Sequence, residues 1–212
     1  MRIFITATNT DIGKTYTTLK LIKALSEQNF KVGVIKPIET GVEQEPLDGK
    51  KLLDAMHKYN PDSIHLTMED IVPIQYPLPA APYIASNKKK LDLNLILKKI
   101  EKIEKCCDIL LIEGAGGLYV PVDEKLMMID LIEYFKVNST LLVTHCKLGC
   151  INDTILSQNA LKEKNLNFET IFNCFERESF DITSNPYIND KMKSTYFLES
   201  DLEKIITKIT SN

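Results

Sequence analysis

Short apolar runs of strand length alternate with longer segments of helical periodicity along most of the chain. The runs that we interpret as strands cover residues 2–8, 31–38, 108–116, 139–146 and 168–175. The segments that we interpret as helices cover residues 15–30, 47–60, 91–107, 127–135 and 151–165, and a further helix ends the chain. Strands that alternate with helices are typical of βαβ units, in which neighbouring strands run parallel. The pattern therefore predicts an α/β fold with a mostly parallel sheet flanked by helices, in one domain spanning residues 1–212.

Local residues refine some of these boundaries. Asp48 is a favoured N-cap residue and predicts that the second helix opens there. The sequence SDLE at 200–203 matches a capping box and predicts the start of the last helix. Two stretches are expected to lack regular structure. They are residues 71–86, which are rich in proline and regular at most at their end, and residues 176–193.

Composition narrows the class of protein. The 212 residues suffice for one hydrophobic core, and 44% hydrophobic and 26% charged residues are ordinary for a globular protein. A net charge of −3 argues against a nucleic-acid binder that relies on a general basic field. No apolar run approaches the roughly 18 residues of a membrane-spanning helix, and the N-terminus has no signal-peptide pattern. We therefore expect a cytoplasmic protein that binds neither nucleic acid nor membranes.

The chain has five cysteines, which are Cys106, Cys107, Cys146, Cys150 and Cys174. They are odd in number and form no C-x-x-C motif, a pattern that predicts reduced thiols rather than a disulfide framework or a zinc site. The three histidines show no ligand spacing, and we interpret them as incidental.

Polar, glycine-bearing loops follow four of the predicted strands, at residues 8–15, 36–41, 113–123 and 147–152. Ligands of parallel α/β sheets bind beyond the carboxyl ends of the strands. We therefore expect these four loops to build one site.

The first of these loops ends like a phosphate-binding loop. In ATNTDIGKT, residues 7–15, Gly13 permits a tight turn and Lys14 can reach between β- and γ-phosphates. Thr15 can offer a hydroxyl to Mg²⁺, and the helix that follows directs its free N–H groups at an anion. A Walker A loop has glycine where Thr8 stands, so a Gly-Lys-Thr turn without a ligand is the alternative interpretation.

The other loops carry groups that suit the same chemistry. Lys36 precedes a proline at the end of a strand, where it would face the ligand. Glu113 directly follows the run DILLI, as a Walker B carboxylate follows its strand to hold Mg²⁺. The junction KLGCIND at 147–153 has helix N–H groups that can hold a carboxylate. The glycines that would keep bulk away from the phosphates are Gly114, Gly116 and Gly117.

These motifs together resemble the dethiobiotin synthase family of the P-loop NTPase superfamily. The chain carries, in the family's order between residues 2 and 175, the motifs TNTDIGKT, KPIETG, PAAP, LLIEGAGGLYVPV and KLGCIND. The family's phosphate loop is lengthened, commonly G-T-D-T-x-V-G-K-T. Here Ala7 takes the place of its first glycine and Asn9 that of its aspartate. Thr8 therefore belongs to a variant loop rather than to a damaged Walker A motif.

The resemblance implies a ligase of biotin biosynthesis. Such an enzyme uses ATP to join CO₂, or bicarbonate, to 7,8-diaminopelargonate (7,8-diaminononanoate) and releases dethiobiotin, ADP and phosphate. One amine takes up CO₂ as a carbamate, the carbamate oxygen attacks the γ-phosphate, and the second amine closes the cyclic urea. The implied metal is Mg²⁺, the co-substrate is ATP, and the implied assembly is a homodimer.

The resemblance also implies roles for individual residues. The implied nucleotide-binding residues are Asp11, Ile12, Gly13, Lys14, Thr15, Tyr16, Asp48, Glu113, Gly114, Ala115, Gly116 and the adenine-reading Asn173. The implied substrate-binding residues are Thr10, Lys36, Thr40, Gly149, Cys150, Ile151 and Asn152. The last four of these would capture the substrate carboxylate across the dimer interface. The implied ligands of Mg²⁺ are Thr15, Asp48 and Glu113. Lys14 and Lys36 are implied to act in catalysis, Lys36 on the carbamate and the transferring phosphoryl group.

Two assignments need a choice. The second metal carboxylate is Asp48 or Asp54, and we choose Asp48 because Asp54 falls inside the predicted helix. The family's proline-bearing adenine loop is not recognisable in MKSTYFLESDLE, residues 192–203, so the base that the site selects stays open.

The main alternative function is a nucleotide-dependent switch ATPase related to partitioning ATPases. Those proteins carry an extra lysine early in the phosphate loop, and residues 8–12 here contain none. The amide-forming synthases of cobalamin assembly need a further glutamine-hydrolysing domain, for which 212 residues leave no room. A catalytically inactive binding module is the third alternative.

Overall fold

A six-stranded parallel sheet organises the part of the chain that the computed structural model describes, residues 1–192 and 195–210. Its strands are β1 (Arg2–Ala7), β2 (Val32–Ile35), β5 (Ile109–Gly117), β6 (Ser139–His145), β7 (Phe168–Asn173) and β8 (Thr195–Phe197). They lie in the order β2-β5-β1-β6-β7-β8, and every neighbouring pair runs parallel. The prediction of a mostly parallel sheet is confirmed.

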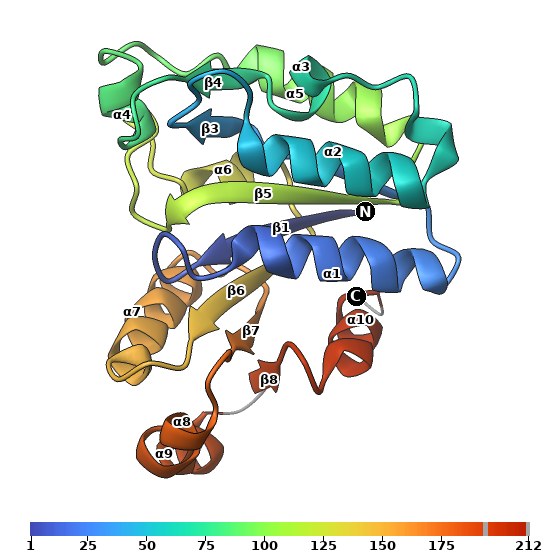
Figure 1. The fold of residues 1–212 in the computed structure, drawn as a ribbon. Coiled ribbons are helices and arrows are strands. Elements are labelled where there is room, and N and C mark those ends of the chain that lie inside the picture. The colour runs from blue at the N-terminus through green and yellow to red at the C-terminus, as the bar shows by residue number, and fades with distance from the viewer. Residues whose placement is uncertain (193–194, 211–212) are drawn as a thin grey trace.

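Helices flank this sheet (Figure 1). On one face, α1 (Lys14–Glu27) lies between α2 (Leu47–Tyr59) and α10 (Leu202–Thr210). The other long helices are α5 (Leu93–Glu104) and α7 (Cys150–Glu163), and the short α6 (Asp130–Tyr134) precedes β6. The strands β1, β5 and β6 end at the same edge of the sheet, so the loops that follow them meet there (Figure 1).

The central strands form the core because they carry apolar residues on both faces. Ile3, Phe4 and Ile5 of β1 are fully buried, and so are Leu110 and Leu111 of β5. Such continuous apolar runs are what a parallel sheet covered on both faces requires. The core therefore fixes the strand ends from which the candidate site is built.

The predicted strand 31–38 is wrong in its second half. β2 ends at Ile35, and Ile38–Thr40 forms β3, which pairs with β4 (Ile74–Tyr76) in a separate two-stranded sheet. Pro37 has no N–H group and cannot continue a central strand, and the N–H of Lys36 bonds to the carbonyl of Ile71.

Two stretches expected to be irregular contain regular elements. Residues 71–86 hold β4, which was not expected, and α4 (Pro82–Ala85), which is the regular end that the prediction allowed. A 3₁₀ turn (Pro61–Ser63) and α3 (Met68–Ile71) lie before β4. In residues 176–193, α8 (Glu178–Thr183) and α9 (Asn185–Lys191) are helical, while residue 193 lies outside the described residues. The fully buried Phe180 and Ile188 pack with Phe172 of β7, and this burial outweighs the polar composition of the segment.

Both predicted helix caps are displaced, that of α2 by two residues and that of α10 by one. The N-cap of α2 is Pro46, so Asp48 is the second residue of the helix rather than its cap. The first hydrogen bond of α10 runs from the N–H of Ile205 to the carbonyl of Asp201, so Ser200 precedes the N-cap. The Asp201 carboxylate also accepts the N–H of Phe197, which ties this helix start to β8.

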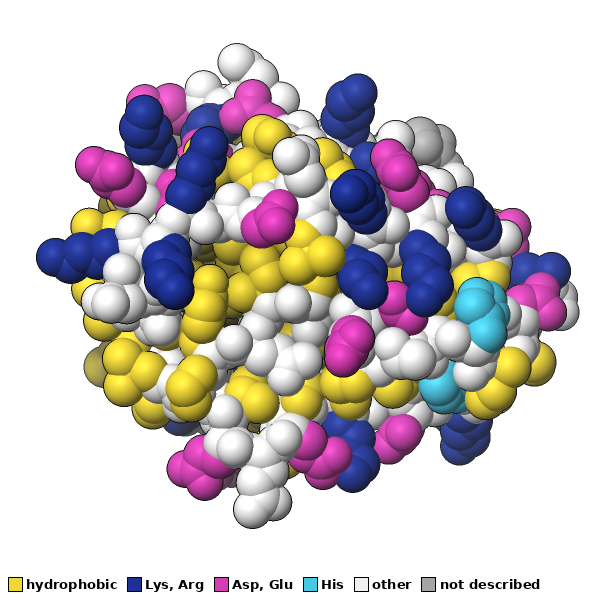
Figure 2. All heavy atoms as spheres, turned by 90° about the horizontal axis from the view of Figure 1, so that it is seen from above, with side chains coloured by type: hydrophobic (Ala, Val, Ile, Leu, Met, Phe, Trp, Pro, Cys, Tyr) yellow, Lys and Arg dark blue, Asp and Glu magenta, His cyan; other side chains and the backbone are white. Residues whose placement is uncertain are grey.

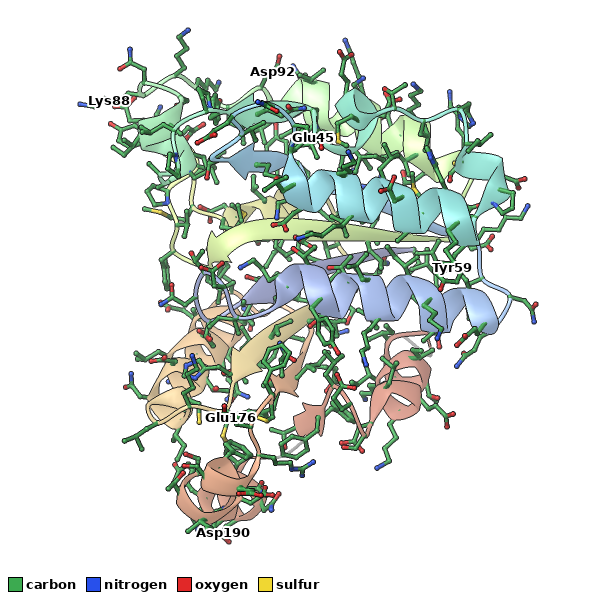
Figure 3. The ribbon with its side chains drawn as sticks, viewed as in Figure 1. Glu45, Tyr59, Lys88, Asp92, Glu176 and Asp190 are labelled. Atoms are coloured by element: carbon green, nitrogen blue, oxygen red, sulfur yellow. A yellow bond between two sulfur atoms is a disulfide. The ribbon has the colours of Figure 1, made fainter. Side chains whose placement is uncertain are left out.

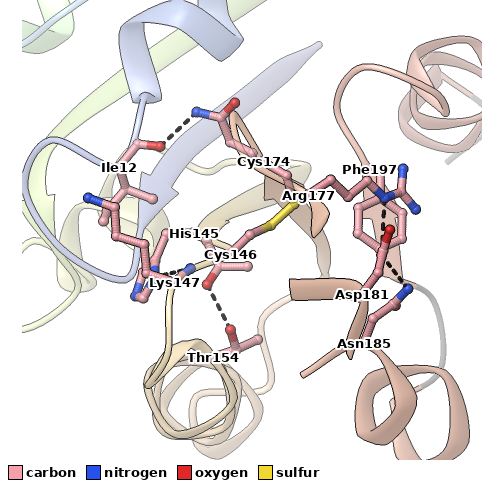
Figure 4. The surroundings of a disulfide bond; sticks show 12 residues. Ile12, His145, Cys146, Lys147, Thr154, Cys174, Arg177, Asp181, Asn185 and Phe197 are labelled. Atoms are coloured by element: carbon pink, nitrogen blue, oxygen red, sulfur yellow. Dashed lines mark hydrogen bonds and ion pairs between the residues drawn. A yellow bond between two sulfur atoms is a disulfide. The ribbon is translucent and has the colours of Figure 1, made fainter. Parts of the chain in front are cut away.

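The prediction that all five cysteines are reduced is wrong, because Cys146 and Cys174 form a disulfide (Figure 4). His145 lies opposite Asn173 in the β6–β7 pair, so the two residues that follow these strands face each other. Their Cα atoms are 5.2 Å apart, a separation that a disulfide spans. Cys106, Cys107 and Cys150 are free thiols.

The surface carries both signs of charge. On the face shown in Figure 2, basic and acidic side chains are interspersed around apolar patches. At the edges of the molecule, exposed side chains such as those of Lys88, Asp92, Glu176 and Asp190 point outward (Figure 3). Within the described ranges, no helix has both the length and the apolar character needed to cross a membrane.

Candidate functional site

The phosphate-type loop connects β1 to α1 through a backbone that favours glycine. Gly13 is the N-cap of α1 with φ +97°, and Asp11 also adopts positive φ, at +57°. The turn folds back so that Lys14 Nζ donates to the carbonyl of Asn9 at 3.1 Å. Lys14 is 7% exposed. Burial, and then the charge of Lys36, lowers the pKa of Lys14 to about 8.

Glu113 lies at the centre of the site, on β5, and its side chain is fully buried. Its Oε1 accepts hydrogen bonds from Thr15 Oγ1 and from Lys36 Nζ, both at 2.7 Å. Its Oε2 accepts one from Thr18 Oγ1 at 2.6 Å. Donors from two other elements, α1 and the end of β2, therefore converge on this carboxylate, which is what the buried charge needs in order to be tolerated.

Lys36 joins this carboxylate to Asp48. Its Nζ donates to Asp48 Oδ2 at 3.2 Å as well as to Glu113. Burial opposes the charge of Lys36, but the nearby carboxylates of Glu113 and Asp48 outweigh it and raise the pKa of the ammonium. In the same way, burial opposes the charge of Asp48, and the Lys36 ammonium outweighs it and lowers the pKa of the carboxyl. Lys36 is thus a permanent cation between two carboxylates.

The oxygen atoms of this cluster suit a hard divalent cation. The Thr15 hydroxyl, the Asp48 carboxylate and the Glu113 carboxylate are held together by direct hydrogen bonds and through Lys36. Hydroxyl and carboxylate oxygens are the donors that Mg²⁺ takes from proteins, usually few in number and beside phosphate oxygens. Asp54, the other candidate, lies instead along a surface groove with Lys20 and Lys58.

The glycine loop after β5 packs against the start of the phosphate-type loop. Gly116 has φ +66°, and Thr10 Oγ1 is 3.6 Å from the position that a Cβ of Gly116 would take. A Cβ on Gly117 would lie 3.2 Å from the carbonyl oxygen of Thr8. The contact at Gly116 is an ordinary one, so it is the missing side chain at Gly117 that lets the two loops approach closely. At Gly114, a Cβ would press on the ring of Phe4 at 3.1 Å, and Ala115 follows with half-buried surface.

A groove of about 330 Å³ lies beside these two loops. Its lining comes from the phosphate-type loop (Thr8, Asn9), the glycine loop (Gly117 to Val120) and the first turns of α7 (Asp153, Leu156, Ser157). The loop 147–152 thus lies at the same edge of the sheet as the phosphate-type loop, as the sequence predicts.

The helix α7 begins at Cys150, and its N-cap is Gly149, with φ +100°. The Cys150 side chain is fully buried, and its N–H donates to the carbonyl of Lys147 at 3.0 Å. Asn152 Nδ2 donates to Asp153 Oδ1, and Asp153 Oδ2 lies 3.0 Å from His145 Nε2. The hydrogen bond to His145 lowers the pKa of Asp153.

Two other predicted residues hold the phosphate-type loop or its helix. Asn173, at the end of β7, donates its Nδ2 to the carbonyl of Ile12 at 2.9 Å, and a Cβ on Gly13 would collide with that Nδ2. Tyr16 donates its hydroxyl to Glu199 at 2.7 Å, and its ring lies 5.7 Å from that of Phe175. Thr40 ends β3 beside Tyr76 of β4, in the two-stranded sheet rather than in the strand that carries Glu113.

Sequence reasoning missed several residues of the site. Thr18 is three residues after Thr15 on α1 and faces the same carboxylate, which helical spacing could have indicated. Glu39 accepts the N–H groups of Asp48 and Gly49, and nothing in the local sequence signals this contact. Of the segment 192–203, residues 193 and 194 lie outside the described residues, and Glu199 contacts Tyr16 and Lys20.

Comparison with known proteins identifies relatives along the whole chain. A family model described as an AAA domain matches residues 1–205. The chain is 45% identical over 203 residues to the ATP-dependent dethiobiotin synthetase of Sulfurovum sp. (strain NBC37-1), covering 95% of this chain and 96% of that protein. It is 37% identical over 213 residues to the ATP-dependent dethiobiotin synthetase of Wolinella succinogenes, covering 99% and 98%.

Solved structures with a similar fold include a plasmid partition protein and a cell division protein complex. A plasmid partition protein from Borrelia burgdorferi superposes with a TM-score of 0.63 at 13% identity, covering 98% of both chains. The MinC:MinD cell division protein complex of Aquifex aeolicus gives a TM-score of 0.56 at 19% identity, covering 92% of this chain and 78% of that one. At identities this low, the similarity shows a shared fold only. This shared fold confirms the prediction of a P-loop NTPase type of fold.

Proposed function

Because the chain belongs to the ATP-dependent dethiobiotin synthetase family, we propose that it carboxylates 7,8-diaminopelargonate and closes the ring of dethiobiotin at the expense of ATP. The products would be dethiobiotin, ADP and phosphate. The observation that carries this proposal is the Lys36 ammonium between the Asp48 and Glu113 carboxylates, beside the phosphate-type loop.

The phosphate-type loop would bind the triphosphate of ATP. Residues 11–16 surround the start of α1, where backbone N–H groups and the helix dipole favour an anion. Lys14 is held next to this turn by the carbonyl of Asn9 and would turn to the phosphates. Phosphate charge would also favour the protonated form of Lys14, whose pKa burial lowers to about 8.

Thr15, Asp48 and Glu113 would hold Mg²⁺ together with phosphate oxygens. When bound, such an ion neutralises charge on the transferring phosphoryl group. Thr15, Thr18 and Lys36 all donate to Glu113 and so fix the orientation of its carboxylate for this role.

Lys36 would stabilise the negative charge of the carbamate and of the transferring phosphoryl group. Its pKa is raised by Glu113 and Asp48, so it stays protonated and acts as a fixed cation rather than as a base. Positioning and charge neutralisation supply most of the catalysis in phosphoryl transfer, and a buried cation at the end of β2 provides both.

The loop 147–152 would bind the carboxylate end of the substrate. Gly149 leaves its surroundings open, since among the described residues none but its chain neighbours has an atom within 4 Å of the position of a Cβ there. Ile151 and Asn152 stand in the first turn of α7, where N–H groups have no partner within the helix. Cys150 would shape the loop rather than donate to the carboxylate, because its side chain is buried and its N–H bonds to the carbonyl of Lys147. Thr10 and Thr40 would contact the rest of the diamino acid.

Two features would complete the enzyme. A second copy of the chain would cover the loop 147–152, where Leu148 is 87% exposed and Tyr119 and Leu156 are each 62% exposed. Asn173 would read adenine with the donor and acceptor that remain after one N–H bonds to Ile12. Gly114, Ala115 and Gly116 would line the nucleotide. We place this biosynthetic reaction in the cytoplasm.

The decisive experiment is the formation of dethiobiotin by the purified protein. ATP, Mg²⁺, bicarbonate and diaminopelargonate together should give dethiobiotin and ADP in equal amounts, and omission of any one should stop the reaction. ATP hydrolysis that continues without diaminopelargonate, with no dethiobiotin formed, would instead support a switch ATPase.

A further inference from the structure

We propose that Glu39 is a positioning residue, which holds the start of α2 so that Asp48 faces the oxygen cluster of Thr15 and Glu113. The inference rests on the proposed function, because the cluster matters as a metal site only if the protein uses Mg-ATP. It concerns a residue that lies on a separate sheet from Glu113.

Glu39 reaches α2 from another element of the fold. It stands in the middle of β3 and is 8% exposed. Its Oε1 accepts the N–H of Asp48 at 3.1 Å, and its Oε2 accepts the N–H of Gly49 at 2.9 Å. Both carboxylate oxygens are therefore occupied by adjacent backbone groups at the second and third positions of the helix.

These are the N–H groups that an N-cap side chain normally satisfies. The N-cap of α2 is Pro46, whose side chain cannot accept a hydrogen bond and so leaves these N–H groups uncapped. Glu39 replaces the missing cap and adds a negative charge at the positive end of the helix dipole. A cap at position 46 would travel with the helix, whereas Glu39 anchors the helix to β3.

The packing around Gly49 fits this anchor. A Cβ at Gly49 would lie 3.3 Å from Glu39 Oε2 and would collide with the side chain of Val72. Glycine at the third helical position therefore lets β3 and the segment before β4 approach the helix closely. The Glu39 carboxylate and Gly49 are therefore complementary in shape as well as joined by a hydrogen bond.

The anchor determines where Asp48 points. Asp48 donates its N–H to Glu39 and, on its side chain, accepts a hydrogen bond from Lys36 at 3.2 Å. Lys36 in turn lies 2.7 Å from Glu113. A shift of the helix start would therefore carry the Asp48 carboxylate away from Thr15 and Glu113. Partners that orient a metal ligand in this way change metal affinity when they are removed.

The experiment compares Kd for ATP measured by calorimetry in Mg²⁺ with Kd measured in EDTA, because their ratio isolates the contribution of the metal. Glu39→Ala should reduce this ratio about tenfold or more, the usual effect of losing such a partner, and leave Kd in EDTA unchanged. Glu39→Gln keeps one acceptor oxygen and should fall between Glu39→Ala and the wild type. The matched control is Glu45→Gln, which removes an exposed carboxylate paired with Lys50 at 2.7 Å beside the same helix and should leave the ratio unchanged (Figure 3).

A second variant separates positioning from simple capping. Pro46→Asp restores a local cap, so in the Glu39→Ala background it should recover the melting temperature but not the metal-dependent ratio. Recovery of both would mean that Glu39 only stabilises the helix, and an unchanged ratio in Glu39→Ala would equally overturn the proposal. If the wild type itself binds ATP with no metal dependence, the proposed function fails. If the wild type shows metal dependence and Glu39→Ala keeps it, only the role of Glu39 fails.

Discussion

Lys36 Nζ lies 2.7 Å from Glu113 Oε1, and this contact joins the end of β2 to the central strand β5 inside the core. The Lys36 side chain is 6% exposed and that of Glu113 is fully buried. Neither charge is well hydrated, so each depends on the other. Glu113 depends also on the hydroxyls of Thr15 and Thr18, and Lys36 depends also on Asp48. The pair therefore contributes to stability as well as to the proposed chemistry.

Replacing Lys36 by Met should destabilise the protein by about 3 kcal/mol, because an unpaired buried carboxylate remains. The double variant Lys36→Met/Glu113→Gln should recover much of this loss, since both charges are then absent, while neither variant should form dethiobiotin. Chemical denaturation measures the stability. The control is Lys20→Met, which breaks the partly exposed pair with Glu199 and should cost less than about 1 kcal/mol. A Lys36→Met loss no larger than the control's would contradict the role of the pair.

A second buried carboxylate should make stability depend on pH. Asp70 is 1% exposed, and its oxygens lie 2.8 Å from Lys99 Nζ and 2.6 Å from Lys102 Nζ. Burial opposes its charge, but hydrogen bonds from Lys102, Lys99 and the Thr67 backbone outweigh burial and lower the pKa of Asp70. A lowered folded pKa stabilises the fold above the unfolded value of about 3.9 and loses this effect as pH falls toward the folded value.

Asp70→Asn should therefore destabilise the protein by about 2 kcal/mol at pH 7, since the lysine partners are partly exposed. The difference from the wild type should stay constant down to about pH 5 and shrink below about pH 4. Melting temperatures of both proteins across this range measure it. A difference that grows on acidification would show that the sign of the Asp70 contribution is wrong.

The parts of the site that were predictable from sequence have local signals. Glu113 follows a continuous apolar run and Lys36 precedes Pro37, so both could be placed at strand ends without knowing the order of the strands. Lys14 and Thr15 follow from the Gly-Lys-Thr sequence. The structure brings Glu113, Lys36 and Thr15 together with Asp48, as the common edge of a parallel sheet requires.

The parts that were missed depend on distant elements. Glu39 contacts α2 only because Pro37 ends the strand and redirects residues 38–40 into a second sheet. Asn173 contacts Ile12 across 161 residues, which requires the strand order β1-β6-β7. The pairing of Cys146 with Cys174 likewise depends on the register of β6 and β7. None of these relationships has a signal within a short window of sequence.

The thiol content gives a direct test of that pairing. The unfolded protein without reductant should show three reactive thiols, five cysteines less the two in the disulfide, and all five after reduction. Cys146→Ser/Cys174→Ser should show three under both conditions. Five thiols in the unreduced wild type would mean that the disulfide does not form. In the folded protein, Cys107 should react slowly at pH 8, because burial raises its pKa to about 12 and the thiolate is the reactive form.

A substitution in the loop 147–152 tests whether this loop binds the substrate carboxylate. Gly149 has φ +100°, but apart from its chain neighbours no described residue has an atom within 4 Å of the position of a Cβ. Gly149→Val should therefore cost about 1–2 kcal/mol of backbone strain and leave the protein folded. The valine side chain would occupy the open space where the substrate carboxylate is proposed to approach the helix. KM for diaminopelargonate should rise strongly, and Kd for ATP should stay nearly unchanged.

If a dimer partner supplies this loop, two inactive variants should complement each other. In a mixed dimer of Lys14→Ala and Gly149→Val chains, one of the two sites combines an intact phosphate loop with an intact loop 147–152, and the other has both defects. Random exchange of equal amounts should therefore restore about a quarter of wild-type activity, since half of the dimers are mixed and each has one working site. The control mixes Lys14→Ala with Thr15→Ala, whose defects lie in the same loop, and should restore nothing. Absence of recovery in the first mixture, with subunit exchange shown by mass spectrometry, would place both loops of each site in one chain.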